Sequence, residues 1–349
     1  MYSIAVLCAG TTALCLAMVL MQGVCVAEET ADATPLRLGV VGYEGHGSVW
    51  TNDLNGGAGE AIGLKVAYVW HKAPIDQGTQ EKFGFEVVAE PSDMIGEVDG
   101  VIIAEELPHR YRALAEPFIR AGVRTFLNRP LAGSAKDAAA LLRLARECGN
   151  PIFAASLLTV DPTVLAVREE RKRCEPLKIV NVTGPTNHFY WYVPHAISAL
   201  VTAIGPGVDE IHAHDFAWEQ EGVTFRNPLV IFFRYGDDAP VGPVRGVIQV
   251  LGPSQPGDWY GFRMKLYGRQ ESPEYVFVKP MPGVSAWMPI YEAMAPFFRE
   301  GKVPFSEQEL FEVPLLVDMV LKSGIENRAV RRSEYAEAIA YLTSPAAEH

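Results

Sequence analysis

The chain has 349 residues, which is enough for two domains. With 49% hydrophobic and 21% charged residues, it has the composition of a globular protein that buries a core. Its formal net charge of −12 argues against a nucleic acid partner, because such binding depends on clustered basic side chains.

Residues 1–27 contain no charged side chain, and residues 4–21 are almost wholly apolar. Small residues at Cys25 and Ala27 suit a secretory leader that is cleaved after Ala27. An uncleaved N-terminal membrane anchor is the alternative. Both readings predict an exported protein, either periplasmic or extracellular.

Residues 36–156 alternate between short apolar runs and segments with helical spacing. We expect strands at 36–41, 64–70, 85–88, 98–104, 123–127 and 151–155, and helices at 45–54, 92–95, 108–122 and 134–149. Near-continuous apolar runs such as VDGVIIA are typical of strands buried on both faces of a parallel sheet. The pattern predicts an α/β domain with a doubly wound parallel sheet, a Rossmann domain.

The pattern changes after this domain. Helices are expected at 162–174 and 194–204, and strands at 177–184, 208–218, 229–235, 244–251, 262–268 and 275–278. A capping box at Ser306 and Glu309 begins a last helix over 306–323. Residues 157–335 are therefore expected to form an α+β domain with an open, mainly antiparallel sheet.

The first strand leads into the glycine-rich turn LGVVGYEGHG. Gly42 and Gly47 occupy the outer glycine positions of a dinucleotide-binding loop, while Glu44 replaces the middle glycine beside Gly45. A carboxylate there would repel a diphosphate, although Glu44 can swing outward while Gly45 supplies free backbone. The loop either binds NAD(P) or only packs as a Rossmann-like turn.

The second strand ends in His71 and Lys72, where an acidic residue usually contacts the adenosine ribose. If a cofactor binds, this basic pair suits a 2′-phosphate and favours NADP over NAD. The alternative is that both are ordinary loop residues.

Three stretches together resemble the glucose–fructose oxidoreductase, inositol dehydrogenase and rhizopine catabolism family (Gfo/Idh/MocA). They are LGVVGYEGHG, VDGVIIAEELPHRYRALAEPFIRAGVRTFLNRPLAGS and NHFYWYVPHAISALVTAIG. The resemblance runs from about residue 36 to 332. It implies an NAD(P)-dependent oxidoreductase, with the 306–323 helix packing back on the first domain.

The resemblance also implies site residues. Arg129 and Pro130 match the family's Glu-Lys-Pro loop with arginine in place of lysine, and His195 matches the family's histidine. Arginine keeps the charge and the N–H donors but stays protonated, so it can polarise a carbonyl and is a poor acid or base. Trp191 stands where the family has an aspartate, one helical turn before His195.

His188, Tyr190, Trp191 and Tyr192 crowd the same approach. Aromatic faces stack on sugar rings, and tyrosine hydroxyls bind their rims, so these residues predict a carbohydrate pocket. A core-packing aromatic cluster with one satisfied histidine is the alternative.

His212 and His214 would face the same side of a strand and could share a metal ion. No third ligand is evident nearby, and no metal site is expected.

These observations favour an exported oxidoreductase that transfers hydride between a tightly held NAD(P) and a sugar or polyol. One competing hypothesis is a catalytically inactive carbohydrate-binding or scaffold protein on the same fold, with no cofactor. Another is a metal-dependent hydrolase using His212 and His214. The open second sheet predicts a homodimer or homotetramer.

Overall fold

A computed structural model describes residues 34–185, 189–214, 229–251, 261–277 and 285–344. In the N-terminal part, six parallel strands form a sheet in the order β3-β2-β1-β4-β5-β6. They are β1 (Leu36–Val41), β2 (Leu64–Trp70), β3 (Glu86–Val87), β4 (Gly100–Ile103), β5 (Arg124–Asn128) and β6 (Ile152–Ala155). The strand order reverses between β1 and β4, and open α/β sheets bind ligands at the carboxyl ends of such strands.

Helices connect these strands: α1 (His46–Asp53), α2 (Gln77–Phe83), α3 (Tyr111–Arg120) and α4 (Ala135–Glu147). The strands β4 and β6 are buried along their whole length, which explains their continuous apolar sequences. Ser134 caps α4 by accepting the N–H of Asp137, as its spacing predicts.

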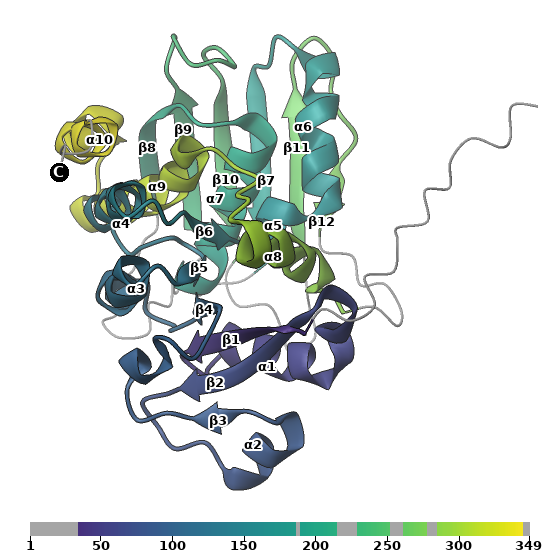
Figure 1. The fold of residues 1–349 in the computed structure, drawn as a ribbon. Coiled ribbons are helices and arrows are strands. Elements are labelled where there is room, and N and C mark those ends of the chain that lie inside the picture. The colour runs from purple at the N-terminus through teal and green to yellow at the C-terminus, as the bar shows by residue number, and fades with distance from the viewer. Residues whose placement is uncertain (1–33, 186–188, 215–228, 252–260, 278–284, 345–349) are drawn as a thin grey trace, which may run out of the picture. The chain divides into compact units, whose positions relative to one another are not determined.

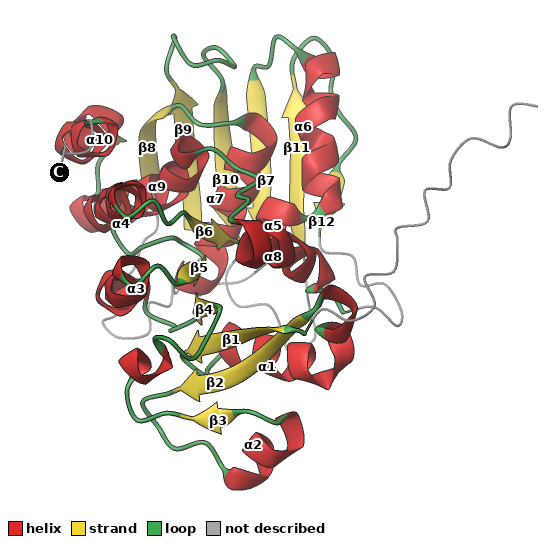
Figure 2. Ribbon diagram, viewed as in Figure 1, coloured by secondary structure: helices red, strands yellow, loops and turns green. Residues whose placement is uncertain are grey.

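The second sheet has seven strands in the order β12-β11-β7-β10-β9-β8-β13. They are β7 (Ile179–Gly184), β8 (Val208–His214), β9 (Leu229–Tyr235), β10 (Arg245–Val250), β11 (Phe262–Tyr267), β12 (Tyr275–Phe277) and β13 (Val330–Arg331). Only β7 and β10 pair in parallel, and the other pairs are antiparallel. The fold class predicted from the sequence is therefore confirmed (Figure 2).

The helices of this part are α5 (Leu157–Val160), α6 (Pro162–Cys174), α7 (Phe189–Ile204), α8 (Met288–Glu300), α9 (Glu307–Glu326) and α10 (Ala336–Thr343). The helices α6, α7 and α9 contact the second sheet. The helix α9 also contacts α4, and the Ala135 N–H donates to Asp318 on α9 at 2.9 Å. The helix α9 thus connects the second sheet to a helix of the first (Figure 1).

One face of the second sheet is exposed in the single chain. Along β9, Leu229, Ile231 and Phe233 are buried, whereas Phe232 between them is 51% exposed. This alternation is that of an antiparallel strand with one face on a core and one face open.

Several helices differ from the expectation. The helix α7 already includes Phe189, ahead of residue 194 where its start was predicted, and Pro194 lies within it. The helices α2, α5, α8 and α10 were not predicted, and α8 also contains an internal proline, Pro296. Residues 215–218 of the strand expected over 208–218 lie outside the described residues. No helix in the described parts of the chain is long and apolar enough to span a membrane.

Candidate functional site

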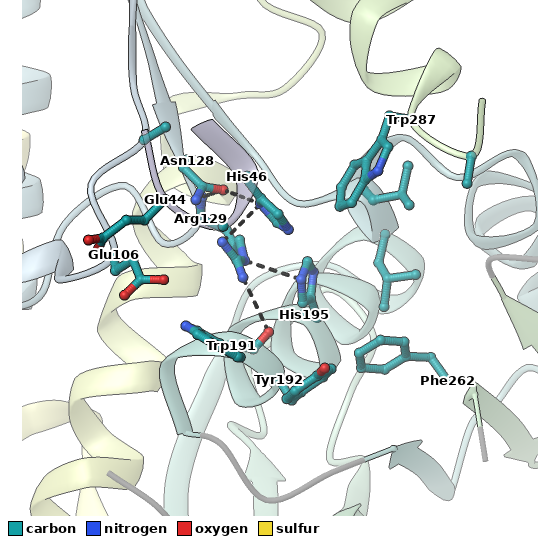
Figure 3. A pocket seen from close by; sticks show the side chains of 15 residues that line it. Glu44, His46, Glu106, Asn128, Arg129, Trp191, Tyr192, His195, Phe262 and Trp287 are labelled. Atoms are coloured by element: carbon teal, nitrogen blue, oxygen red, sulfur yellow. Dashed lines mark hydrogen bonds between the residues drawn. The ribbon is translucent and has the colours of Figure 1, made fainter. Parts of the chain in front are cut away.

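A cavity of about 280 Å³ lies where the two parts of the chain meet, beside the carboxyl ends of β4 and β5 (Figure 3). One wall comes from the β1–α1 loop and from the residues at and just after the ends of β4 and β5. The opposite wall comes from α5, α7, β11 and the residues just before α8. The lining residues are Glu44, Gly45, His46, Ala104, Glu106, Asn128, Arg129, Leu157, Leu158, Trp191, Tyr192, His195, Phe262, Ala286 and Trp287.

The glycine-rich turn has the close packing of a dinucleotide-binding loop. A Cβ atom on Gly47 would lie 2.0 Å from the Gly42 carbonyl oxygen, and one on Gly42 would lie 2.7 Å from the Glu105 nitrogen. Gly42 and Gly45 both have positive φ, at 99° and 49°. No side chain among the described residues caps α1, and although the Gly47 N–H already donates to the Glu44 carbonyl oxygen at 2.9 Å, the other N–H groups of the first turn remain for an anion. The backbone geometry at this end of the site suits a diphosphate, but the carboxylates of Glu44 and Glu106 lie beside it.

Glu44 turns toward the end of β2 and binds the basic pair there. Its carboxylate lies 3.2 Å from Lys72 Nζ and 3.3 Å from His71 Nε2. Lys72 also lies 3.8 Å from the buried carboxylate of Glu105. His71 Nδ1 accepts the Tyr43 N–H at 3.2 Å. The two basic residues that suggested NADP are therefore already engaged by acidic and backbone groups, and the structure gives no support for a 2′-phosphate site at this position.

Arg129 follows β5 and reaches into the cavity, and its peptide bond to Pro130 is cis. Its Nε–H donates to His195 Nε2 at 3.1 Å, and Nη2 lies 3.4 Å from the Trp191 carbonyl oxygen. Burial lowers the pKa of Arg129 to about 10, so it stays protonated at neutral pH. Pro130 itself borders a smaller pocket beneath this loop rather than the main cavity.

His195, on α7, is engaged at both ring nitrogens. Nε2 accepts from Arg129, so the proton lies on Nδ1, which donates to Ser156 Oγ at 2.5 Å. Burial and then the charge of Arg129 hold the pKa of His195 well below its ordinary value. His195 is therefore neutral at pH 7, and Nε2 can accept a proton only when Arg129 moves to another acceptor.

A second histidine, His46, faces Arg129 from the first turn of α1. Its Nδ1 lies 3.0 Å from Asn128 Oδ1 and 3.0 Å from Arg129 Nη1. One nitrogen cannot donate to the amide oxygen and accept from the guanidinium at once, so the tautomer of His46 selects between them. The ring packs against Trp287, with centroids 4.5 Å apart. Burial and then Arg129 lower the pKa of His46 well below its ordinary value.

The predicted aromatic residues separate into two groups. Trp191 and Tyr192 line the cavity. Tyr190 lies outside its lining and packs edge-to-face on Phe189, with centroids 5.2 Å apart. His188 lies outside the described residues. The cavity wall is completed by Phe262 and Trp287, which the sequence did not single out.

His212 and His214 lie side by side on β8, with ring centroids 3.9 Å apart. Within the described parts of the chain, no group of three side chains could hold a metal ion.

The sequence predicted that Arg129 and His195 belong to one site, but it did not predict the residues that contact them, His46 and Ser156. His46 carried a local signal, since it stands between Gly45 and Gly47 in the turn. Ser156 follows β6 and caps α5 by accepting the Leu158 N–H. A serine at a helix N-terminus is common, so its contact with His195 had no signal in the sequence.

Comparison with known proteins identifies the first domain. Residues 36–156 match the family model GFO_IDH_MocA, described as an oxidoreductase family with an NAD-binding Rossmann fold. No curated protein matches the sequence.

Solved structures share the fold over most of the chain. GenD2 from gentamicin A biosynthesis, solved with NAD, is 14% identical with a TM-score of 0.71, over 86% of this chain and 97% of that one. Scyllo-inositol dehydrogenase from Lactobacillus casei, solved with NAD(H) and scyllo-inositol, is 10% identical with a TM-score of 0.69, over 85% of this chain and 99% of that one. A probable dehydrogenase from Thermotoga maritima is 16% identical with a TM-score of 0.66, over 86% of this chain and 100% of that one.

At these identities the solved structures establish the fold alone. The family match over residues 36–156 covers the Rossmann sheet and the loops that carry Gly42, Gly47 and Arg129. Residues 36–156 therefore match the Gfo/Idh/MocA oxidoreductase family, which is described by its NAD-binding Rossmann fold.

Proposed function

We propose that this protein is an oxidoreductase that binds NAD at the β1–α1 loop and acts on a sugar or polyol in the adjoining cavity. One observation carries the proposal: Gly45 and His46 from the nucleotide loop line the same cavity as Arg129 and His195. The solved inositol dehydrogenases from Lactobacillus casei, which contain NAD(H) together with inositol, support this choice of cofactor and substrate class.

The cofactor that fits these residues is NAD. Gly42, Gly45, Gly47 and the first turn of α1 would hold its diphosphate. Lys72 is paired with Glu44 and lies near Glu105, so a 2′-phosphate would have to break these contacts. Hydride exchange with a substrate carbon is the chemistry that bound NAD supplies.

The chain's own residues would move the proton and orient the substrate. Arg129 would donate to a substrate oxygen, which releases Nε2 of His195. That nitrogen would then accept the hydroxyl proton when an alcohol is oxidised and return it in the reverse direction. Trp191 and Tyr192 would pack against the carbon skeleton.

The test is turnover of purified protein with NAD⁺ and a panel of polyols and sugars, followed by NADH absorbance. His195→Ala should lower kcat by about 10²- to 10⁴-fold, the usual contribution of general acid–base catalysis. His109→Gln, which changes an exposed histidine, is the matched control and should leave kcat unchanged. Equal turnover by His195→Ala and the parent protein would exclude the proposed role of His195.

A second candidate is a carbohydrate-binding protein without turnover. The observation in its favour is that Arg129 stays protonated while both ring nitrogens of His195 are engaged. A sugar that binds the purified protein with the same affinity with and without NAD, and is never oxidised, would select this candidate.

We also propose that residues 1–27 direct export, on the basis of their uncharged apolar sequence. Fractionation of cells that express the full chain tests this. Recovery of the protein outside the cytoplasm supports export, and recovery in the cytoplasm with residues 1–27 still attached contradicts it.

The exposed face of the second sheet supports a homodimer or homotetramer. Phe232 on β9 is 51% exposed there, and apolar exposure on an open sheet is typical of an interface. Light scattering on the purified protein should give a mass of two or four chains, and Phe232→Glu should lower it. A monomeric parent protein would contradict the proposal.

A further inference from the structure

Arg129 has no carboxylate partner among the described residues. Its three contacts are with His195, His46 and the Trp191 carbonyl oxygen. Both histidines are neutral at pH 7, because burial lowers the pKa of each. A guanidinium has five N–H donors, so these contacts leave two of them for a ligand in the cavity.

The positive charge of Arg129 would be stabilised by a negatively charged ligand. Removing a charged group from water is expensive unless an opposite charge accompanies it. Arg129 is half-buried at the cavity, where the neutral rings of His46 and His195 contact it and Glu106 is the acidic side chain whose charge acts on it. A ligand carboxylate would supply the missing charge and could accept two parallel N–H donors.

The acidic residues of the cavity lie on the side of Arg129 away from Phe262 and Trp287. Glu44 is paired with Lys72, and Glu105 behind it is paired with Arg110. Glu106 lines the cavity near Glu44, and burial followed by the charge of Glu44 raises its pKa. Figure 3 shows Glu44 and Glu106 on one side of Arg129, with Phe262 and Trp287 on the opposite side. The space beside Arg129, His195 and the aromatic wall is therefore the part that suits an anion.

We propose that the substrate is a polyhydroxy acid, a sugar acid whose carboxylate is held by Arg129. Arg129 Nε lies 3.1 Å from His195 Nε2 before it turns to the carboxylate, so the hydroxyl carbon next to that carboxylate would lie beside His195. Trp191 and Tyr192 would contact the remaining carbon chain. This inference rests on the proposed oxidoreductase function and specifies its substrate class.

Calorimetric titration with matched pairs tests the substrate class without any need for turnover. The pairs are D-gluconate with D-glucitol and D-glucuronate with D-glucose, which differ mainly in the carboxylate. The acid of at least one pair should bind at least about tenfold more tightly, as expected for a charge-assisted contact of about 1.4 kcal/mol. Arg129→Gln should remove this difference, and Arg129→Lys should retain part of it.

Arg120→Gln is the matched control, because it removes the same charge from the exposed end of α3. It should leave the preference for the acid unchanged. Equal binding of acid and neutral compound in both pairs would overturn the inference, as would a preference that survives Arg129→Gln.

The two proposals fail separately. NADH binding without any preference for the acids would overturn the substrate class and leave the oxidoreductase proposal standing. A clear, Arg129-dependent preference in a protein that does not bind NADH would support the anion site and overturn the redox function.

Discussion

Ser156 fixes the orientation of His195 from the side away from the cavity. It is buried, its Oγ accepts from Nδ1 of His195 at 2.5 Å, and the same oxygen accepts the Leu158 N–H at 3.0 Å. A hydrogen bond to Nδ1 decides which tautomer the ring adopts and therefore whether Nε2 has a free lone pair.

Ser156→Ala should therefore lower kcat about tenfold and shift the acidic limb of the pH–rate profile, because the imidazole can rotate and change tautomer. Ser156→Thr keeps the hydroxyl and should restore the parent pH profile. An unchanged profile in Ser156→Ala would show that the serine only caps α5.

Glu44 is the residue that most directly opposes a diphosphate at the nucleotide loop. Glu44→Gln keeps the size of the side chain and removes its charge. NADH should bind about fivefold more tightly, since the repulsion between two like charges about 4 Å apart in water is worth about 1 kcal/mol. NADPH should gain at least as much, because Lys72 loses its partner. Weaker NADH binding in this variant would show that the carboxylate instead contacts the cofactor.

At the residue scale the sequence revealed the chemistry only where a motif carried it. Arg129 and His195 could be named because each belongs to a recognisable stretch. The contacts of His46 and Ser156 depend on segments that are distant along the chain, and no local pattern encodes such a meeting.

The helix α9 is anchored to the second sheet by a buried carboxylate. Glu312 is fully buried, accepts the N–H groups of Gly207 and Val208 at 2.8 and 3.1 Å, and pairs with Arg332 at 2.7 Å. These contacts hold the start of β8 against α9.

Glu312→Ala should lower the free energy of unfolding by about 3–5 kcal/mol, because Arg332 and two N–H groups lose their acceptor. Glu337→Ala, at an exposed position on α10, is the control and should change it by less than about 0.5 kcal/mol. Chemical denaturation measures both. A loss of less than 1 kcal/mol in Glu312→Ala would contradict this role of the carboxylate.

At the element scale, apolar runs predicted the strands well, whereas internal prolines hid the start of α7 and the presence of α8. The strands β1, β2 and β9 have the bounds expected from their sequences. Proline removes one helical hydrogen bond, so it reads as a helix boundary. In α7 and α8, apolar side chains pack on both sides of the proline and offset that loss, and such packing is not visible in a local pattern.

At the scale of the whole molecule, the two buried histidines link stability to pH. Burial lowers the pKa of both His46 and His195 in the folded state, whereas both titrate near 6.5 when the chain is unfolded. Below that pH the unfolded chain binds more protons than the folded chain, so stability must fall as the pH falls.

The free energy of unfolding should drop between pH 6.5 and 5.5 by up to about 1 kcal/mol per histidine. Replacing both by glutamine should flatten this part of the curve. Urea denaturation at several pH values measures the slope, and an equal slope in the parent protein and the double variant would contradict the linkage.

The parallel, doubly wound character of the first sheet followed from the alternation of strands and helices. The cavity could not be predicted in the same way. Its walls come from β1–α1, β4, β5, α5, α7 and β11, and only the packed chain brings them together.

The central claim is that the protein binds NAD at the β1–α1 loop. Titration of the purified protein with NADH, monitored by calorimetry and by nicotinamide fluorescence, tests it most directly. We predict saturable binding of one NADH per chain with a Kd below about 1 mM, within the usual range for substrates and cofactors of enzymes. NADPH should bind more weakly than NADH. No binding of either nucleotide at millimolar concentration would contradict the proposed function.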